Sequence, residues 1–122
     1  MKGKLRMSLT RTASFIRRLV TFRFLNILPG TSRLTRSLQL TRVTNRGEVI
    51  AFQRRAVGAT GTTVVRYQFV NAATGVPVSN SVTVSGNRVV VLPFVLPAGT
   101  VKLRITNVGT ATVQVEGVIL VF

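Results

Sequence analysis

A regular alternation of apolar and polar side chains runs through TTVVRYQFV, residues 62–70. Val65, Tyr67 and Phe69 fall on one side of this stretch, and Arg66 falls on the other. An alternation of period two is typical of a β-strand with one buried face, because successive side chains of a strand point to opposite sides. The stretch therefore predicts an amphipathic strand that lies against a core.

The rest of the C-terminal part repeats this pattern between turn signals. Further strands are predicted over residues 48–57, 76–85, 88–96, 101–106 and 111–122, separated by segments rich in Gly, Pro and Asn. About six strands with regularly spaced turns are typical of a sandwich or a jelly roll. We therefore predict an all-β fold, a single jelly-roll or immunoglobulin-like β-sandwich over residues 47–122.

Several details of these strands carry predictions of their own. Pro93 has no backbone N–H, so its strand is expected at a sheet edge or with a bulge. The inward-facing positions change phase at Gly117, which predicts a β-bulge there. If the turn around Gly109 closes a regular hairpin, Glu116 lies opposite Lys102 as an ion pair across the strands. The predicted core consists of Val65, Tyr67, Phe69, Val82, Val84, Val89, Val91, Leu103, Ile105, Val113, Val115 and Leu120.

The charge is distributed unevenly along the chain. The 122 residues include 17 Lys and Arg against 2 Asp and Glu, a net charge of +15. Eleven of the basic residues and neither acidic residue lie in residues 1–46. We predict that residues 1–46 form an extended basic N-terminal arm attached to the sandwich domain.

Apolar side chains interrupt the basic charge of this arm. They alternate with polar ones around Phe22 and around Leu38, so extended segments are predicted there rather than a helix. The Pro29-Gly30 pair separates the two segments as a turn or hinge. A sandwich of about six strands leaves open edges, and open edges pair with other chains. We therefore expect the arm to contact neighbouring copies through Phe15, Ile16, Val20, Phe22, Phe24, Leu38 and Leu40.

The composition argues against an enzyme. The chain has no His, Cys, Asp or Trp, and its only carboxylate side chains are Glu48 and Glu116. General acid–base catalysis needs a group that titrates near the working pH, and hydroxyl nucleophiles need a base beside them. Metal sites are built from imidazole, thiolate or clustered carboxylates. We therefore expect no catalytic residue, no cofactor, no metal and no small-molecule substrate. No apolar stretch approaches the length of a transmembrane segment either.

Two resemblances bear on function. The segment PAGTVKLRITNVG, residues 97–109, followed by VQVEGV, residues 113–118, resembles the closing hairpin of bacterial surface jelly rolls, which include small subunits of spore-surface and appendage fibres. That resemblance implies an N-terminal extension that docks into the preceding subunit. Because the chain has no Cys, such a fibre would depend on strand insertion and packing. The plan of a basic arm on a small β-sandwich also resembles small viral capsid proteins, which implies that the arm neutralises packaged nucleic acid.

These observations lead to two hypotheses. The first is a structural subunit that assembles with copies of itself into a filament, appendage or shell, on an extracellular surface or in a particle, by arm docking and strand insertion. The alternative is a capsid-type protein of a virion that binds nucleic acid or another polyanion by counterion release. Its predicted contacts are Arg6, Arg11, Arg17, Arg18, Arg23, Arg33, Arg36 and Arg42. A membrane-surface role and carbohydrate binding are weaker options, because the chain lacks Trp and an amphipathic helix.

Overall fold

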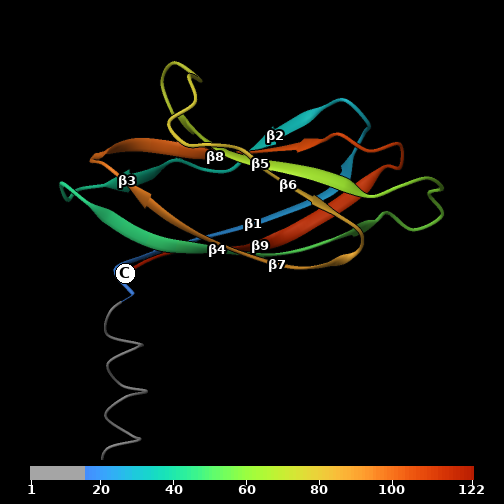
Figure 1. The fold of residues 1–122 in the computed structure, drawn as a ribbon, viewed down its shortest axis with the longest axis horizontal. Helices are drawn as coiled ribbons and strands as arrows, with labels where there is room; N and C mark the ends of the chain where they lie inside the picture. Colours follow the sequence, from blue (N-terminus) through green and yellow to red (C-terminus); the bar gives the residue numbers. More distant parts are fainter. Residues whose placement is uncertain (1–15) are drawn as a thin grey trace, which may run out of the picture.

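The computed structural model describes residues 16–122, and in this range the chain forms strands and no helix, hence none that could span a membrane. Two antiparallel sheets face each other (Figure 1). Sheet A contains, in spatial order, β1 (Arg18–Ile27), β9 (Val113–Val121), β4 (Asn45–Arg55) and β7 (Arg88–Leu96). Sheet B contains β2 (Ser32–Leu34), β8 (Gly99–Asn107), β5 (Val64–Asn71) and β6 (Val82–Ser85), and β3 (Leu38–Leu40) pairs with β8 beyond β2.

The strand order is that of a jelly roll. β2 and β3 are two parts of one strand along β8, and Thr35 between them bonds both backbone groups of Leu103. Counted so, the first strand pairs with the last, the second with the seventh, the third with the sixth and the fourth with the fifth. This nested pairing describes a hairpin rolled into two sheets. The predicted all-β sandwich is confirmed, and the strand order selects the jelly roll over the immunoglobulin-like arrangement.

The N-terminal part differs from the predicted division into an arm over 1–46 and a domain over 47–122. β1 pairs with β9 from Arg18↔Val121 to Phe24↔Val115, and β2 and β3 pair with β8. Residue 46 lies inside β4. The alternation around Phe22 does mark a strand, but the partner of this strand is the last strand of the same chain. Of the predicted arm, residues 1–15 lie outside the described part of the chain.

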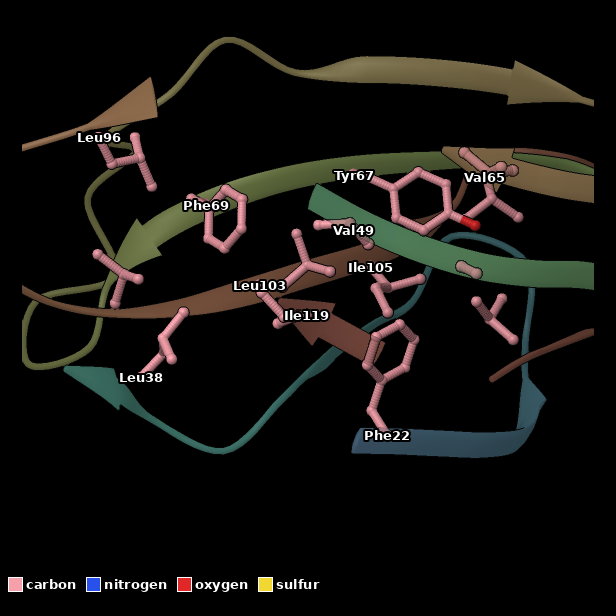
Figure 2. Close-up of a cluster of buried hydrophobic side chains, with 14 of the residues drawn as sticks. Phe22, Leu38, Val49, Val65, Tyr67, Phe69, Leu96, Leu103, Ile105 and Ile119 are labelled. Atoms are coloured by element: carbon pink, nitrogen blue, oxygen red, sulfur yellow. The ribbon is translucent and has the colours of Figure 1, made fainter. Parts of the chain in front are cut away.

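The core lies between the sheets (Figure 2). Seven of the predicted core residues are buried, namely Val65, Tyr67, Phe69, Leu103, Ile105, Val113 and Val115. Val84 packs partly buried against them, whereas Leu120 is half-buried, and Val82, Val89 and Val91 are exposed. β7 has the opposite phase from the predicted one, with Val90 buried instead. Because residues 88–96 are apolar on both faces, the sequence pattern does not determine which face is inside.

The predicted bulge at Gly117 is not formed, and the reason for this glycine is a close approach. Gly117 lies in unbroken register opposite Phe22 on one side and Ala51 on the other. A Cβ atom there would lie 2.2 Å from the Ile50 carbonyl oxygen and 3.0 Å from the Phe22 ring. The register shift lies in β1 instead, where Phe24 and Ile27 oppose Val115 and Val113. β9 therefore keeps one phase to its end, which is why Ile119 is buried rather than Leu120.

The predicted pair of Glu116 and Lys102 is also absent, because β8 and β9 belong to different sheets. The chain crosses between the sheets after Asn107 instead of closing a hairpin. Glu116 lies opposite Arg23 of β1, and Arg23 Nε approaches Glu116 Oε2 to 3.5 Å. The expectation for Pro93 is confirmed, since β7 is an edge strand of sheet A.

Candidate assembly and polyanion-binding surfaces

The outward face of sheet B carries three cations and no carboxylate side chain. Arg66 of β5 and Lys102 and Arg104 of β8 point outward on adjacent strands, each half-buried. The register places Gln68 opposite Arg104, and Arg104 Nη2 donates to Gln68 Oε1 at 2.8 Å. This contact holds one guanidinium along the sheet surface. We call this surface the sheet B face; Thr106 lies on the same side of the sheet but is buried.

Hydroxyl groups lie beside these cations. Thr106 is opposite Arg66 on one side and Ser32 on the other, and the Ser32 and Thr106 hydroxyl oxygens lie 2.7 Å apart. Thr83 of β6 lies opposite Arg66 on the side of β5 that faces away from β8. Arginine, lysine and hydroxyl side chains make most protein contacts to phosphate oxygens. The sheet B face therefore has the chemistry of a sequence-independent phosphate-binding surface.

A second group of cations surrounds the cleft where the described chain begins. This cleft, of about 220 Å³, is lined by Arg17, Arg18, Gln39, Thr41, Arg42, Asn45 and Val121. Arg17 N donates to the Val121 carbonyl oxygen. The buried Asn45 side chain accepts from Arg42 N at 3.2 Å and donates to Arg42 O at 2.8 Å, which fixes the loop that carries Arg42. The three arginines thus line one cleft, and hydrogen bonds fix the backbone of Arg17 and Arg42 beside it.

The predicted anion contacts are only partly brought together. Arg17, Arg18 and Arg42 share the cleft. Arg33 and Arg36 are exposed along β2 and the link that follows it, where Arg33 Nη2 donates to the Asn26 carbonyl oxygen at 3.0 Å. Arg23 lies in sheet A, where it faces Glu116. Arg6 and Arg11 lie outside the described residues.

Most of the predicted intersubunit contacts pack inside their own subunit. Phe22, Leu38 and Leu40 are core residues, with 8%, 2% and 3% of their surface exposed. Val20 and Phe24 pack partly buried against that core, and Ile16 is half-buried at the start of the described chain. Phe15 lies outside the described residues. The apolar alternation in the N-terminal part thus supplies strands to this jelly roll.

The outward face of sheet A has a different character. We call it the sheet A face and define it by Leu19, Thr21 and Arg23 of β1, Glu116, Val118 and Leu120 of β9, Arg46, Glu48, Ile50, Phe52 and Arg54 of β4, and Val89, Val91 and Val95 of β7. Leu19, Phe52 and the three valines are exposed. Both carboxylate side chains of the protein lie on this face. It is therefore apolar at its centre and close to neutral in charge.

Within residues 16–122, every buried side-chain nitrogen and oxygen has a hydrogen-bond partner. Tyr67 Oη donates to Gln53 Oε1 at 2.8 Å, and Gln53 Nε2 donates to the Val84 and Gly86 carbonyl oxygens at 2.9 Å. Burial raises the pKa of the Tyr67 phenol above its ordinary value. Residues 16–122 contain no group of three or more His, Cys, Asp or Glu that could hold a metal ion. The described surfaces offer charge and apolar area for binding.

Comparison with known proteins identifies the fold. No family model and no curated protein matches the chain. A chain in the crystal structure of the T13 particle of infectious bursal disease virus superposes with a TM-score of 0.50 at 17% identity, over 85% of this chain and 30% of that chain. A chain of the Gx strain of the same virus gives a TM-score of 0.49 at 15% identity, over 85% and 31%. The first likeness shows a shared fold. The protein spans about 30% of the length of the viral chain that it matches.

Sequence reasoning overlooked the two broad faces as binding surfaces. The alternation predicts that Lys102 and Arg104 point away from the core and that Arg66 points to the other side of its strand from the buried Tyr67. That Arg66 lies beside Arg104 depends on the register of β5 with β8, which no local pattern encodes. The sequence does not show which valines of β7 point outward, because residues 88–96 are apolar on both faces.

Proposed function

We propose that the protein is a structural subunit of a virus-type particle, built from copies of this chain, and that its cationic surfaces bind the enclosed nucleic acid. The observation that carries the proposal is the separation of charge between the two broad faces of a jelly roll. The sheet B face has cations alone, whereas both carboxylate side chains lie on the sheet A face. The fold shared with a chain of a viral particle supports the proposal.

Nucleic acid would be held through its phosphates. The sheet B face presents Arg66, Lys102 and Arg104, and the cleft presents three further arginines. A guanidinium group can bind a phosphate through two parallel hydrogen bonds. Residues 1–15 add Lys2, Lys4, Arg6 and Arg11. Binding of this kind depends on counterion release and does not distinguish sequences. A subunit that packages a genome needs this property.

A filament or appendage held together by an inserted arm has less support. That hypothesis assigned Phe22, Phe24, Leu38 and Leu40 to a neighbouring copy, and these side chains pack in their own sandwich. Assembly from copies of one chain is common to both hypotheses. Electron micrographs of the purified assembly distinguish them, because a closed shell supports the particle and a fibre supports the filament.

The salt dependence of binding tests the nucleic-acid part of the proposal. The triple variant R66Q/K102Q/R104Q removes the three cations of the sheet B face from the full chain. We expect the slope of log K against log salt for a single- or double-stranded oligonucleotide to fall by about 2 to 3, because each phosphate contact contributes about 0.7 to 0.9. The matched control is R23Q/R46Q/R54Q, which removes the same charge from the opposite sheet and should leave the slope nearly unchanged.

Two results would overturn this part of the proposal. One is the absence of oligonucleotide binding by the wild-type chain at low salt. The other is an equal loss of slope in both triple variants, which would mean that net charge alone, and no particular surface, governs binding. The ultraviolet spectrum of purified assemblies gives an independent check, because nucleic acid absorbs far more strongly than a chain with one Tyr and no Trp, and nuclease should remove that absorbance once the assemblies are opened.

A further inference from the structure

We propose that copies of this chain contact each other through the sheet A face. The occupant of this face is the sheet A face of a second copy. This inference rests on the proposed function in one respect, since a particle requires contacts between copies. It goes further by assigning those contacts to one face of the jelly roll. Residues of β1, β9, β4 and β7 form this face, and no strand is exchanged.

The apolar side chains of this face are neighbours across β9, β4 and β7, and Leu19 of β1 adjoins them in the next row. Leu19 lies opposite Leu120, and Val118 lies opposite Ile50, which in turn lies opposite Val91. The next row places Phe52 opposite Val89. Adjacent strands of a sheet are about 4.8 Å apart, so these side chains form one continuous surface. Contiguous exposed apolar surface on a soluble protein marks an interaction site.

The dimensions of the face set the expected strength of the contact. Four strands about 4.8 Å apart and five outward positions about 6.8 Å apart give a face of roughly 19 by 27 Å, or about 500 Å². A stable pair of proteins buries about 800 Å² on each partner. A single contact of this size is therefore weak, and a stable assembly depends on many such contacts made at once. Reversible contacts of this kind allow a shell to correct errors during assembly.

The charges identify a second copy as the occupant. A chain with a net charge of +15 repels its own copies, so two copies associate only through a surface where charge is balanced. The sheet A face provides that balance, because Arg23, Arg46 and Arg54 lie among Glu48 and Glu116. Arg23 and Glu116 remain solvent-accessible in their 3.5 Å pair, so each is available to a charge on the opposing copy. An acidic partner would instead be attracted to the sheet B face.

A charge placed on this face tests the inference in solution. V91K puts an ammonium group at a position that is 53% exposed. V57K makes the same change at a residue that is 94% exposed and lies outside the face, in the loop that follows β4. We expect V91K to weaken self-association of the full chain at least tenfold in sedimentation velocity, whereas V57K associates as the wild type does. Nuclease treatment excludes association through nucleic acid. Raised salt should strengthen the contact, because it screens the repulsion between two chains that each carry a charge of +15. Equal behaviour of the two variants overturns the inference, provided that both unfold at the wild-type temperature.

Single thiols locate the contact within the assembly itself. The chain has no Cys, so V91C and V57C each introduce one unique site for a maleimide. In assembled protein we expect the thiol of V91C to react at least tenfold more slowly than that of V57C. Equal rates in well-formed particles overturn the inference and leave the proposed function standing. If no particle forms while pairs sensitive to V91K do, the proposed function fails and the inference stands. A wild-type chain that stays monomeric under all conditions overturns both.

Discussion

The substitution Phe22→Ala tests whether β1 belongs to its own subunit. The Phe22 ring lies inside the sandwich and is 8% exposed (Figure 2). Its centroid is 6.1 Å from that of Phe24. It lies over Gly117, where a Cβ atom would be 3.0 Å from the ring. If β1 were instead inserted into a neighbouring copy, the same ring would stabilise the assembly and leave the stability of a monomer unaffected. The two arrangements therefore give different results for one variant.

The structure sets the size of the effect. Truncation of a buried Phe to Ala costs about 3 to 5 kcal/mol, and the upper part of this range applies when the cavity stays open. Gly117 has no side chain with which to fill the space, and its backbone is held in register by β1 and β4. In a domain of about 100 residues, 1 kcal/mol shifts the unfolding temperature by about 4 to 8 °C. We expect Phe22→Ala to lower that temperature by about 12 °C or more.

Thermal unfolding of the full chain, followed by circular dichroism at low protein concentration, measures this shift. The matched control is Leu19→Ala on the same strand, because Leu19 points outward and is 56% exposed. The control should change the free energy of unfolding by no more than about 0.5 kcal/mol. A Phe22→Ala variant that unfolds at the wild-type temperature but no longer assembles would refute the reasoning and return β1 to a neighbouring subunit.

Three further predictions follow from the core. Because burial raises the pKa of Tyr67, the folded protein keeps the phenolic proton to higher pH than the unfolded chain, and the free energy of unfolding falls as pH rises above about 10. The phenolate absorbance of this single tyrosine should therefore appear together with unfolding. Ionisation of Tyr67 near pH 10 in the intact fold would contradict this. Tyr67→Phe leaves Gln53 Oε1 without its donor and should cost about 1 to 3 kcal/mol in denaturant unfolding, while it abolishes the alkaline effect; unchanged stability would show that another donor reaches Gln53. Gly117→Ala places a Cβ atom 2.2 Å from the Ile50 carbonyl oxygen and should destabilise the fold by about 3 kcal/mol or more, so a variant of wild-type unfolding temperature would disprove the close approach.

The strands could be predicted from the sequence because each depends on local alternation. The prediction over 88–96 coincides with β7, and the turn at Pro29-Gly30 is formed, with Gly30 at a φ of 79°. Pro93 marks an edge strand for the simple reason that it has no N–H to donate. In each of these cases the property is carried by the residue or by its immediate neighbours.

The pairing of strands could not be predicted, because it is not a local property. The sequence around Phe22 is consistent with pairing to any exposed edge, and only the complete fold shows that β9 of the same chain is the partner. The short segment after Asn107 looks like a hairpin turn, but it carries the chain from sheet B to sheet A. The candidate surfaces depend on the same information, since Arg66 and Arg104 become neighbours only through the register of β5 with β8.

The edges of the two sheets explain why contacts between copies should use a face. In sheet A, the β1 edge is interrupted by the register shift between Phe24 and Ile27, and the β7 edge contains Pro93, which cannot donate a ladder hydrogen bond. In sheet B, one edge is divided into β2 and β3 of three residues each, and the other is β6 of four residues. Short strands, bulges and proline are the devices by which proteins prevent pairing at sheet edges. A strand inserted from another copy would find no long regular edge among the described strands, whereas the sheet A face offers an apolar patch on β9, β4 and β7 that charged side chains surround. Assembly by packing of faces therefore agrees with the fold better than assembly by strand exchange.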